Sequence, residues 1–169
     1  GPVRSQRTSP GRSCARARPT SPTDGAGRGS ALHARLTAAG VTVSLGHSDC
    51  SADDATRLFD AGARGVTHLF NAMSQLGNRA PGLVGAALDH PDVWCGIVAD
   101  GHHVDPMTLR VALRAKRGQH GKGRIFLVTD AMALVGTQQS SFELNGRTIT
   151  RSPGGLCPKL TLADGTIAG

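Results

Sequence analysis

The chain has 169 residues, a length that suits one medium-sized domain with a real hydrophobic core. Its formal net charge of +7 is uneven, because residues 1–30 carry a balance of +5 and the remainder only +2. The chain has no Tyr and one Trp, and the basic segment has no aromatic residue to stack on bases. These features argue against nucleic-acid binding, so we expect no nucleic-acid partner.

The four cysteines, Cys14, Cys50, Cys95 and Cys157, are far apart and form no C-x-x-C pair. This spacing is typical of reduced thiols in a cytosolic protein and not of a disulfide framework or a structural zinc site. No apolar run approaches the ~18–20 residues of a membrane span, and the N-terminus lacks the apolar core of a secretory signal. The sequence therefore predicts a cytoplasmic protein with no membrane partner.

Residues 1–30 are rich in Arg, Ser, Pro and Gly, and Val3 is the only large aliphatic residue among them. Such a composition cannot bury enough apolar area to offset the entropy lost on ordering. We expect an irregular or disordered segment, with a basic interaction arm as the alternative. The first two residues, Gly1-Pro2, are consistent with a processing or tag scar.

The next stretch predicts two parallel strands joined by a helix. A helix over Ala31–Ala39 leads into a β-branched run, Val41–Leu45, which is followed by Gly46-His47-Ser48. Ser51 is a good N-cap for a second helix. A second strand over Gly65–Leu69 then contains His68. Such β-α-β units pair their strands in parallel, so His47 and His68 are expected at the same edge of the sheet.

The two histidines are candidate metal ligands. Neighbouring strands lie about 4.8 Å apart, and a zinc–imidazole bond is about 2.0–2.1 Å long, so two such side chains can converge on one ion. Taken singly, either histidine could equally bond to a loop carbonyl. Their matching positions at two strand ends favour the metal.

A polar loop follows His68 and contains Asn71-Ala72-Met73 and, further on, Arg79. A loop at the carboxyl end of a strand offers backbone N–H groups, and a guanidinium can form a fork on an oxyanion. Arg79 is therefore a candidate anion ligand. A solvated surface arginine is the commoner alternative for such a residue.

Two further β/α units are predicted. A short helix over Leu83–Leu88 precedes a third buried strand over Val93–Ala99, after which His103 stands beyond the strand end. A helix over Met107–Lys116 follows. Of the double histidine at 102–103, we expect one side chain to face a ligand and the other to be a spectator.

The fourth predicted strand, Ile125–Thr129, ends at Asp130. An aspartate at the end of a buried parallel strand is costly unless it is hydrogen-bonded, paired or directed to a metal. Taken alone it could equally be a helix cap. Because Asp130 is expected at the same edge as two candidate metal ligands, we predict a catalytic role for it.

From Ser141 the pattern alternates, and Asn145-Gly146 is a strong hairpin-turn signal. We therefore predict an irregular segment over 1–30, a partial (β/α) barrel over 31–140 and a β-hairpin segment over 141–169. The fold class is α/β, a partial TIM-type barrel with a small β-hairpin appendage. A flavodoxin-like open sheet is the alternative, and the lack of a Gly-rich dinucleotide fingerprint or P-loop lowers it.

A set of motifs in residues 31–169 resembles the N-acetylglucosamine-6-phosphate deacetylases, a family of metal-dependent TIM barrels in the amidohydrolase superfamily. These motifs are Gly46-His47-Ser48, Thr67-His68-Leu69-Phe70-Asn71-Ala72-Met73, Arg79-Ala80-Pro81-Gly82, Ala99-Asp100-Gly101-His102-His103-Val104-Asp105 and Val128-Thr129-Asp130-Ala131. The combination is highly specific. A deaminase of the same superfamily is a weaker alternative, because the Asn71-Ala72 and Arg79 set points to a phosphate.

The resemblance implies a role for each matching residue. His47 and His68 would bind a divalent metal ion, with zinc the first expectation and iron, cobalt or manganese as alternatives. Asp130 would act as general base and then general acid. The sugar phosphate would be bound by Asn71, the Ala72 backbone, Arg79 and, at the sugar, His103.

The implied reaction is hydrolysis of the N-acetyl group of N-acetylglucosamine 6-phosphate to glucosamine 6-phosphate and acetate. The metal would lower the pKa of bound water and polarise the amide carbonyl. The family is commonly dimeric, so a homodimer is expected, with the phosphate ligands reaching a neighbouring subunit.

The sequence departs from the family at its N-terminal end. The family's Leu-Glu-Gly-Pro-Phe motif supplies a further metal ligand, its glutamate, and a following Gly-Ala-His supplies a histidine; neither is present here. A full barrel needs about 250 residues. Two hypotheses follow: residues 3–30 are an out-of-frame reading joined to an in-frame remainder, and the chain is a catalytically inactive fragment that needs a complementing piece.

Overall fold

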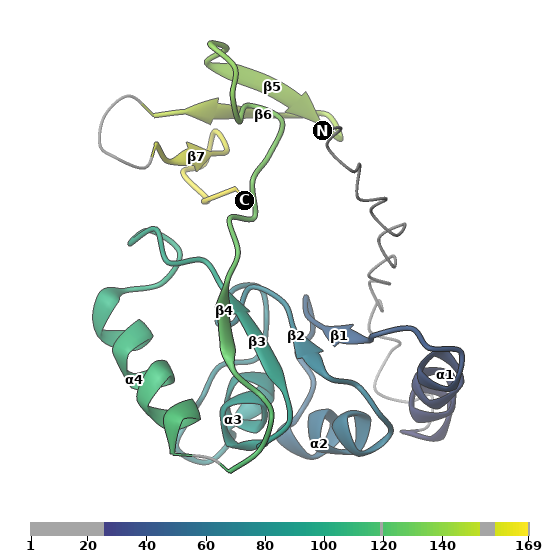
Figure 1. Ribbon diagram of the computed structural model, residues 1–169. Helices are drawn as coiled ribbons and strands as arrows, with labels where there is room; N and C mark the ends of the chain where they lie inside the picture. The colour runs from purple at the N-terminus through teal and green to yellow at the C-terminus, as the bar shows by residue number, and fades with distance from the viewer. Residues whose placement is uncertain (1–25, 119, 153–157, 169) are drawn as a thin grey trace, which may run out of the picture.

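The computed structural model describes residues 26–118, 120–152 and 158–168 (Figure 1). Its helices are α1 (Ala26–Ala38), α2 (Ala52–Asp60), α3 (Gly82–Asp89) and α4 (Pro106–Arg117). Its strands are β1 (Ser44–Leu45), β2 (Gly65–Val66), β3 (Trp94–Ile97), β4 (Ile125–Leu127), β5 (Ser141–Leu144), β6 (Arg147–Arg151) and β7 (Leu160–Thr161). Among these described helices, none combines the length and the apolar character needed to cross a membrane.

Strands β1 to β4 form one parallel sheet in sequence order, and a helix connects each strand to the next. Leu45 pairs with Val66, and Val66 pairs in turn with Cys95. This alternation confirms the predicted α/β class with parallel β-α-β units. Four strands correspond to half of an eight-stranded barrel, in agreement with a partial barrel.

The hydrophobic core lies between the parallel sheet and its helices. Phe59 of α2 and Leu83 of α3 are fully buried, as is Cys95 of β3. The Cys95 thiol lies against the backbone of α3, and burial raises its pKa to about 11. The buried side chains between sheet and helices hold the strands in place, and the chain continues from the carboxyl end of each strand into a loop.

The helix ends agree with the sequence signals. The Ser51 hydroxyl accepts a hydrogen bond from the Asp54 N–H at 3.1 Å, so the predicted N-cap of α2 is confirmed. Asp105 caps α4 in the same way, and Pro106 occupies the first turn. Gly62, with a φ of +106°, follows the end of α2 in the left-handed conformation that glycine adopts readily.

The predicted start of the first helix was wrong. The first helix begins at Ala26, five residues before the predicted Ala31, so residues 26–30 are helical and not irregular. Extending an existing helix adds one backbone hydrogen bond per residue, which outweighs weak local propensity. Residues 1–25 of the segment expected to be irregular lie outside the described residues.

The strands are also shorter than predicted, because the chain leaves the extended conformation early. β1 and β2 have two residues each, and His47 and His68 just beyond them have positive φ angles of +50° and +29°. Single backbone bonds prolong the pairing, as in the bond from the Thr67 N–H to the Leu45 carbonyl at 2.9 Å.

The C-terminal segment forms a separate antiparallel sheet in the order β5-β6-β7. Asn145 and Gly146 have φ angles of +52° and +73°, the pattern of a type I′ turn, which confirms the predicted hairpin. β7 adds a third strand to it. Figure 1 shows this small sheet set apart from the β/α body and joined to it by the segment after β4.

Core burial leads to a stability prediction for a matched pair of leucine substitutions. Leu83→Ala, at a side chain with 0% exposure, should lower the free energy of unfolding by about 2–5 kcal/mol, because it leaves a cavity. Leu127→Ala, at 73% exposure, should change it by at most about 0.5 kcal/mol. Urea denaturation of both variants checks this, and equal effects would contradict the placement of the core.

Candidate active site

His47 and His68 lie side by side at the carboxyl ends of β1 and β2. Their Nε2 atoms are 2.8 Å apart, and their rings meet edge to face, with centroids 4.6 Å apart and an interplanar angle of 82°. The parallel register explains the meeting, since each histidine stands two residues beyond a paired residue, Leu45 or Val66. The structure thus brings together the two predicted metal ligands.

The two Nε2 atoms lie within hydrogen-bonding distance, and their spacing is also close to that of two ligands on one metal ion. Two zinc–imidazole bonds at a tetrahedral angle would separate the two nitrogens by roughly 3.3 Å. The observed 2.8 Å therefore needs only a small opening for both lone pairs to face one ion. Within the described ranges, no group of three or more His, Cys, Asp or Glu side chains is arranged so that it could hold a metal.

His68 carries a second sign of an incomplete site. Its side chain is 5% exposed, and its Nδ1 is buried without a hydrogen-bond partner among the residues that the structure describes. Metal-binding histidines usually donate their other ring N–H to a carboxylate, a carbonyl or water. Among the described residues, the Nδ1 of His68 thus lacks such a partner.

The backbone around the pair is strained. Non-glycine residues with positive φ concentrate at the carboxyl ends of the strands: His47 (+50°), His68 (+29°), Phe70 (+79°), Ala72 (+49°) and Asp130 (+48°). Each such conformation costs on the order of 1–3 kcal/mol and persists only where neighbouring contacts fix it. Strain of this kind is commonest at catalytic and ligand-binding sites.

Ser74 supplies contacts that fix these loops. Its hydroxyl donates to the Cys50 carbonyl at 2.6 Å and accepts the Leu83 N–H at 2.7 Å. Its own N–H donates to the Ser48 carbonyl at 3.1 Å. One side chain and its backbone therefore join the loop after β1, the loop after β2 and the first turn of α3.

Of the predicted phosphate ligands, only Ala72 lines the hollow beside His47. Ala72 is exposed and, with His47, lines a hollow of about 420 Å³. The Asn71 side chain instead closes its own turn, donating to the carbonyls of His68 at 3.4 Å and Leu69 at 3.3 Å. Arg79 lies exposed in the following loop and is not among the residues that line this hollow.

His103 follows β3 and is held by Asp100. The Asp100 Oδ2 lies 2.7 Å from the His103 Nδ1, and Oδ1 accepts the backbone N–H groups of His102 and His103 at 2.8 and 2.9 Å. Burial alone would raise the pKa of the Asp100 carboxyl. The hydrogen bonds from the His103 N–H, the His103 ring and the His102 N–H outweigh burial and hold that pKa below its ordinary range.

Asp130 stands at the same edge but away from the histidine pair. The strand order places β1 and β4 at opposite sides of the sheet, three strand spacings or roughly 14 Å apart. The expectation of a buried strand end was wrong: Phe126 and Leu127 of β4 and Asp130 itself are exposed, because among the described strands β4 pairs with β3 alone.

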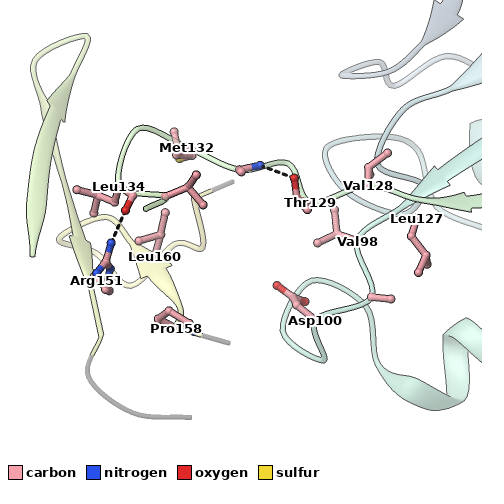
Figure 2. A pocket seen from close by; sticks show the side chains of 13 residues that line it. Val98, Asp100, Leu127, Val128, Thr129, Met132, Leu134, Arg151, Pro158 and Leu160 are labelled. Carbon is pink, nitrogen blue, oxygen red and sulfur yellow. Dashed lines mark hydrogen bonds between the residues drawn. The ribbon is translucent and has the colours of Figure 1, made fainter. Parts of the chain in front are cut away.

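A second hollow, of about 470 Å³, lies between the ends of β3 and β4 and the small sheet (Figure 2). Apolar side chains such as Val98, Leu134 and Leu160 line it, together with Asp100. Arg151 of β6 donates to the Thr137 and Leu134 carbonyls and so fastens the small sheet to the connecting segment.

Two residues of the site were missed in the sequence. Asp100 had a local signal, because an Asp-Gly pair at a strand end with a histidine three residues after the aspartate is typical of an Asx-type turn. Ser74 had no local sequence signal, since its partners Cys50 and Leu83 lie 24 and 9 residues away along the chain.

A parallel sheet with helical crossovers and polar residues at the carboxyl ends of its strands is the arrangement of α/β enzymes, both (β/α) barrels and open sheets. Comparison with known proteins narrows the class. No protein-family model matches the chain. It is 41% identical over 137 residues to an N-acetylgalactosamine-6-phosphate deacetylase of Shewanella sp. (strain ANA-3), covering 80% of this chain and 32% of that protein.

Solved structures of sugar-phosphate deacetylases are also similar to this chain. The N-acetylglucosamine-6-phosphate deacetylase of Pasteurella multocida superposes with a TM-score of 0.74 at 35% identity, over 84% of this chain and 35% of that one. A mutant of the Mycobacterium smegmatis enzyme, in complex with N-acetyl-D-glucosamine-6-phosphate, superposes with a TM-score of 0.72 at 33% identity, over 83% and 35% of the two chains. The chain is thus a homologue of the N-acetylglucosamine-6-phosphate deacetylases and spans about a third of their length, which confirms the predicted resemblance.

The Ser74 contacts lead to a prediction about loop stability. Ser74→Ala leaves the Leu83 N–H and the Cys50 carbonyl without their partner, which should cost about 1–3 kcal/mol. Hydrogen exchange at the Leu83 amide should accelerate accordingly. Ser140→Ala, at an exposed serine, is the matched control and should leave both quantities unchanged. Equal effects of the two substitutions would contradict this role.

The lowered pKa of Asp100 predicts a pH-dependent contribution to stability. Its carboxylate stabilises the fold fully above the unfolded pKa of about 3.9, and this contribution is lost as the pH falls through the lower folded pKa. The stability difference between wild type and Asp100→Asn should therefore shrink as the pH falls from 5 to 3. Urea titrations at several pH values measure it, and a difference that stays constant or widens would refute the assignment.

Proposed function

We propose that this chain is part of an enzyme that hydrolyses the N-acetyl group of N-acetylglucosamine 6-phosphate to glucosamine 6-phosphate and acetate. The observation that carries the proposal is the convergence of the His47 and His68 Nε2 atoms, 2.8 Å apart at adjacent strand ends. It occurs in a chain homologous to sugar-phosphate deacetylases. Residues 31–140 would form the barrel segment and residues 141–169 the small sheet beside it.

His47 and His68 would together hold a divalent cation, zinc in the first place, with iron, cobalt or manganese as alternatives. Imidazole nitrogens suit all four metals, and a pair of them occupies half of a tetrahedral shell. Such an ion lowers the pKa of bound water and polarises the amide carbonyl. The two histidines contribute orientation, because the paired strands hold both rings at one height.

Asp130 would carry the proton through the reaction. Its carboxylate would accept a proton from the attacking water and return it to the nitrogen of the departing amine. The left-handed backbone at Asp130, with a φ of +48°, suits a side chain that must be aimed from the end of β4. Curvature of the sheet into a closed barrel would bring this strand end towards the histidine pair.

The sugar phosphate would be bound by the loop after β2 and by His103. The Ala72 backbone lines the hollow beside His47, and Asn71 and Arg79 follow on the same loop. We propose a homodimer in which Arg79 reaches the partner's site, which accounts for its exposure and for its place outside this hollow. A phosphorylated sugar cannot cross a membrane unaided, so the enzyme would work in the cytoplasm.

The substrate's configuration is a separate question, because two relatives act on N-acetylgalactosamine 6-phosphate according to their names. The two sugars differ at a single hydroxyl group. Both should therefore be assayed, and we expect faster acetate release from the glucosamine derivative.

The test has two parts, both on the full chain. Zinc binding by calorimetry should weaken at least 10–100-fold in His68→Ala, whereas His120→Ala, at an exposed histidine, should bind as wild type does. Acetate release should be lost in His68→Ala and in Asp130→Ala. Zinc binding without any acetate release would favour the inactive-fragment alternative, and zinc binding that does not depend on His68 would overturn the proposed site.

A further inference from the structure

Asp100 makes two distinct sets of contacts in the loop after β3. Oδ1 accepts the N–H groups of His102 and His103 at 2.8 and 2.9 Å, which closes the turn. Oδ2 lies 2.7 Å from the Nδ1 of the His103 ring. The side chains are 23% exposed at Asp100 and 11% exposed at His103, so little water competes for this bond.

The contact at Oδ2 decides where the proton of the His103 ring resides. An ionised carboxylate has no proton to donate, so a ring nitrogen at 2.7 Å from it must be the donor. In a neutral imidazole the other nitrogen, Nε2, then carries the lone pair and accepts hydrogen bonds. The two contacts at Oδ1 are enough to close the turn, so the bond from the His103 ring to Oδ2 is independent of turn closure.

We propose that Asp100 is a positioning residue that fixes His103 in the Nδ1–H tautomer, so that Nε2 accepts a hydrogen bond from a hydroxyl group of the sugar. The second half of this inference rests on the proposed function, whereas the first half stands on the geometry alone. Asp100 also lines the hollow of about 470 Å³ between the ends of β3 and β4 and the small sheet, and the His103 ring is not among the residues that line it (Figure 2).

Asp100→Asn separates the positioning role from the structural one. The asparagine Oδ1 can still accept both backbone N–H groups, so the turn is kept. Its NH₂ group then occupies the place of Oδ2 and can only donate to the ring. The His103 Nδ1 must become the acceptor, and the proton moves to Nε2. The fold survives while the tautomer reverses.

Nitrogen-15 NMR of the imidazole rings in the full chain, at about pH 8 where an ordinary histidine is neutral, reads the tautomer directly. His103→Gln removes the ring in question and so assigns its signals, and His102→Ala identifies those of the neighbouring ring. Wild type should show a protonated Nδ1 and an unprotonated Nε2, and Asp100→Asn the reverse. A protonated Nε2 in wild type, or an unchanged tautomer in Asp100→Asn, would overturn the inference.

Titration with N-acetylglucosamine 6-phosphate tests the contact with the sugar. Asp100→Asn should bind it about tenfold more weakly, the effect of one neutral hydrogen bond, and His102→Ala should bind as wild type does. Equal binding by wild type and Asp100→Asn would overturn the hydroxyl contact. A wild type with the expected tautomer that binds neither N-acetylhexosamine 6-phosphate would refute the proposed function and leave the role of Asp100 in place.

Discussion

The parallel pairing of β1 with β2 is the constraint on which the rest of the site depends. Leu45 faces Val66 in this register, and the two histidines stand at equal distance beyond them. A slip of one residue would displace one ring by about 3.3 Å along the strand and turn it to the other face. The 2.8 Å distance between the two Nε2 atoms therefore depends first on the strand register and only then on the loops.

The loops beyond these strands are held in conformations that local sequence disfavours. His68, Phe70 and Ala72 have positive φ angles within five residues, and Ser74 ties this stretch to the loop after β1 and to α3. Beneath them, the buried contacts of Phe59 and Leu83 fix the helices against the sheet. The layered core thus offsets backbone strain at the edge where the proposed chemistry takes place.

Local signals in the sequence were enough to predict much of the fold. The Ser51 cap, the apolar runs and the Asn145-Gly146 turn each act over a few residues, so helices, strand order and hairpin could be inferred from them. The exposure of β4 could not be predicted from local signals, because it depends on whether a further strand lies beside Leu127. The histidine pair was predictable from β-α-β geometry. The Asp100 contact with His103 required side-chain positions, and the place of Asp130 relative to the histidines depends on curvature of the whole sheet.

The central claim is that His47 and His68 bind a single metal ion together. X-ray absorption at the zinc edge, on the full chain loaded with one equivalent of zinc, counts the imidazole ligands directly. Wild type should show two imidazole nitrogens at about 2.0–2.1 Å from the zinc, and His68→Ala should show one. A zinc shell without imidazole, or one that is the same in wild type and His68→Ala, would contradict it.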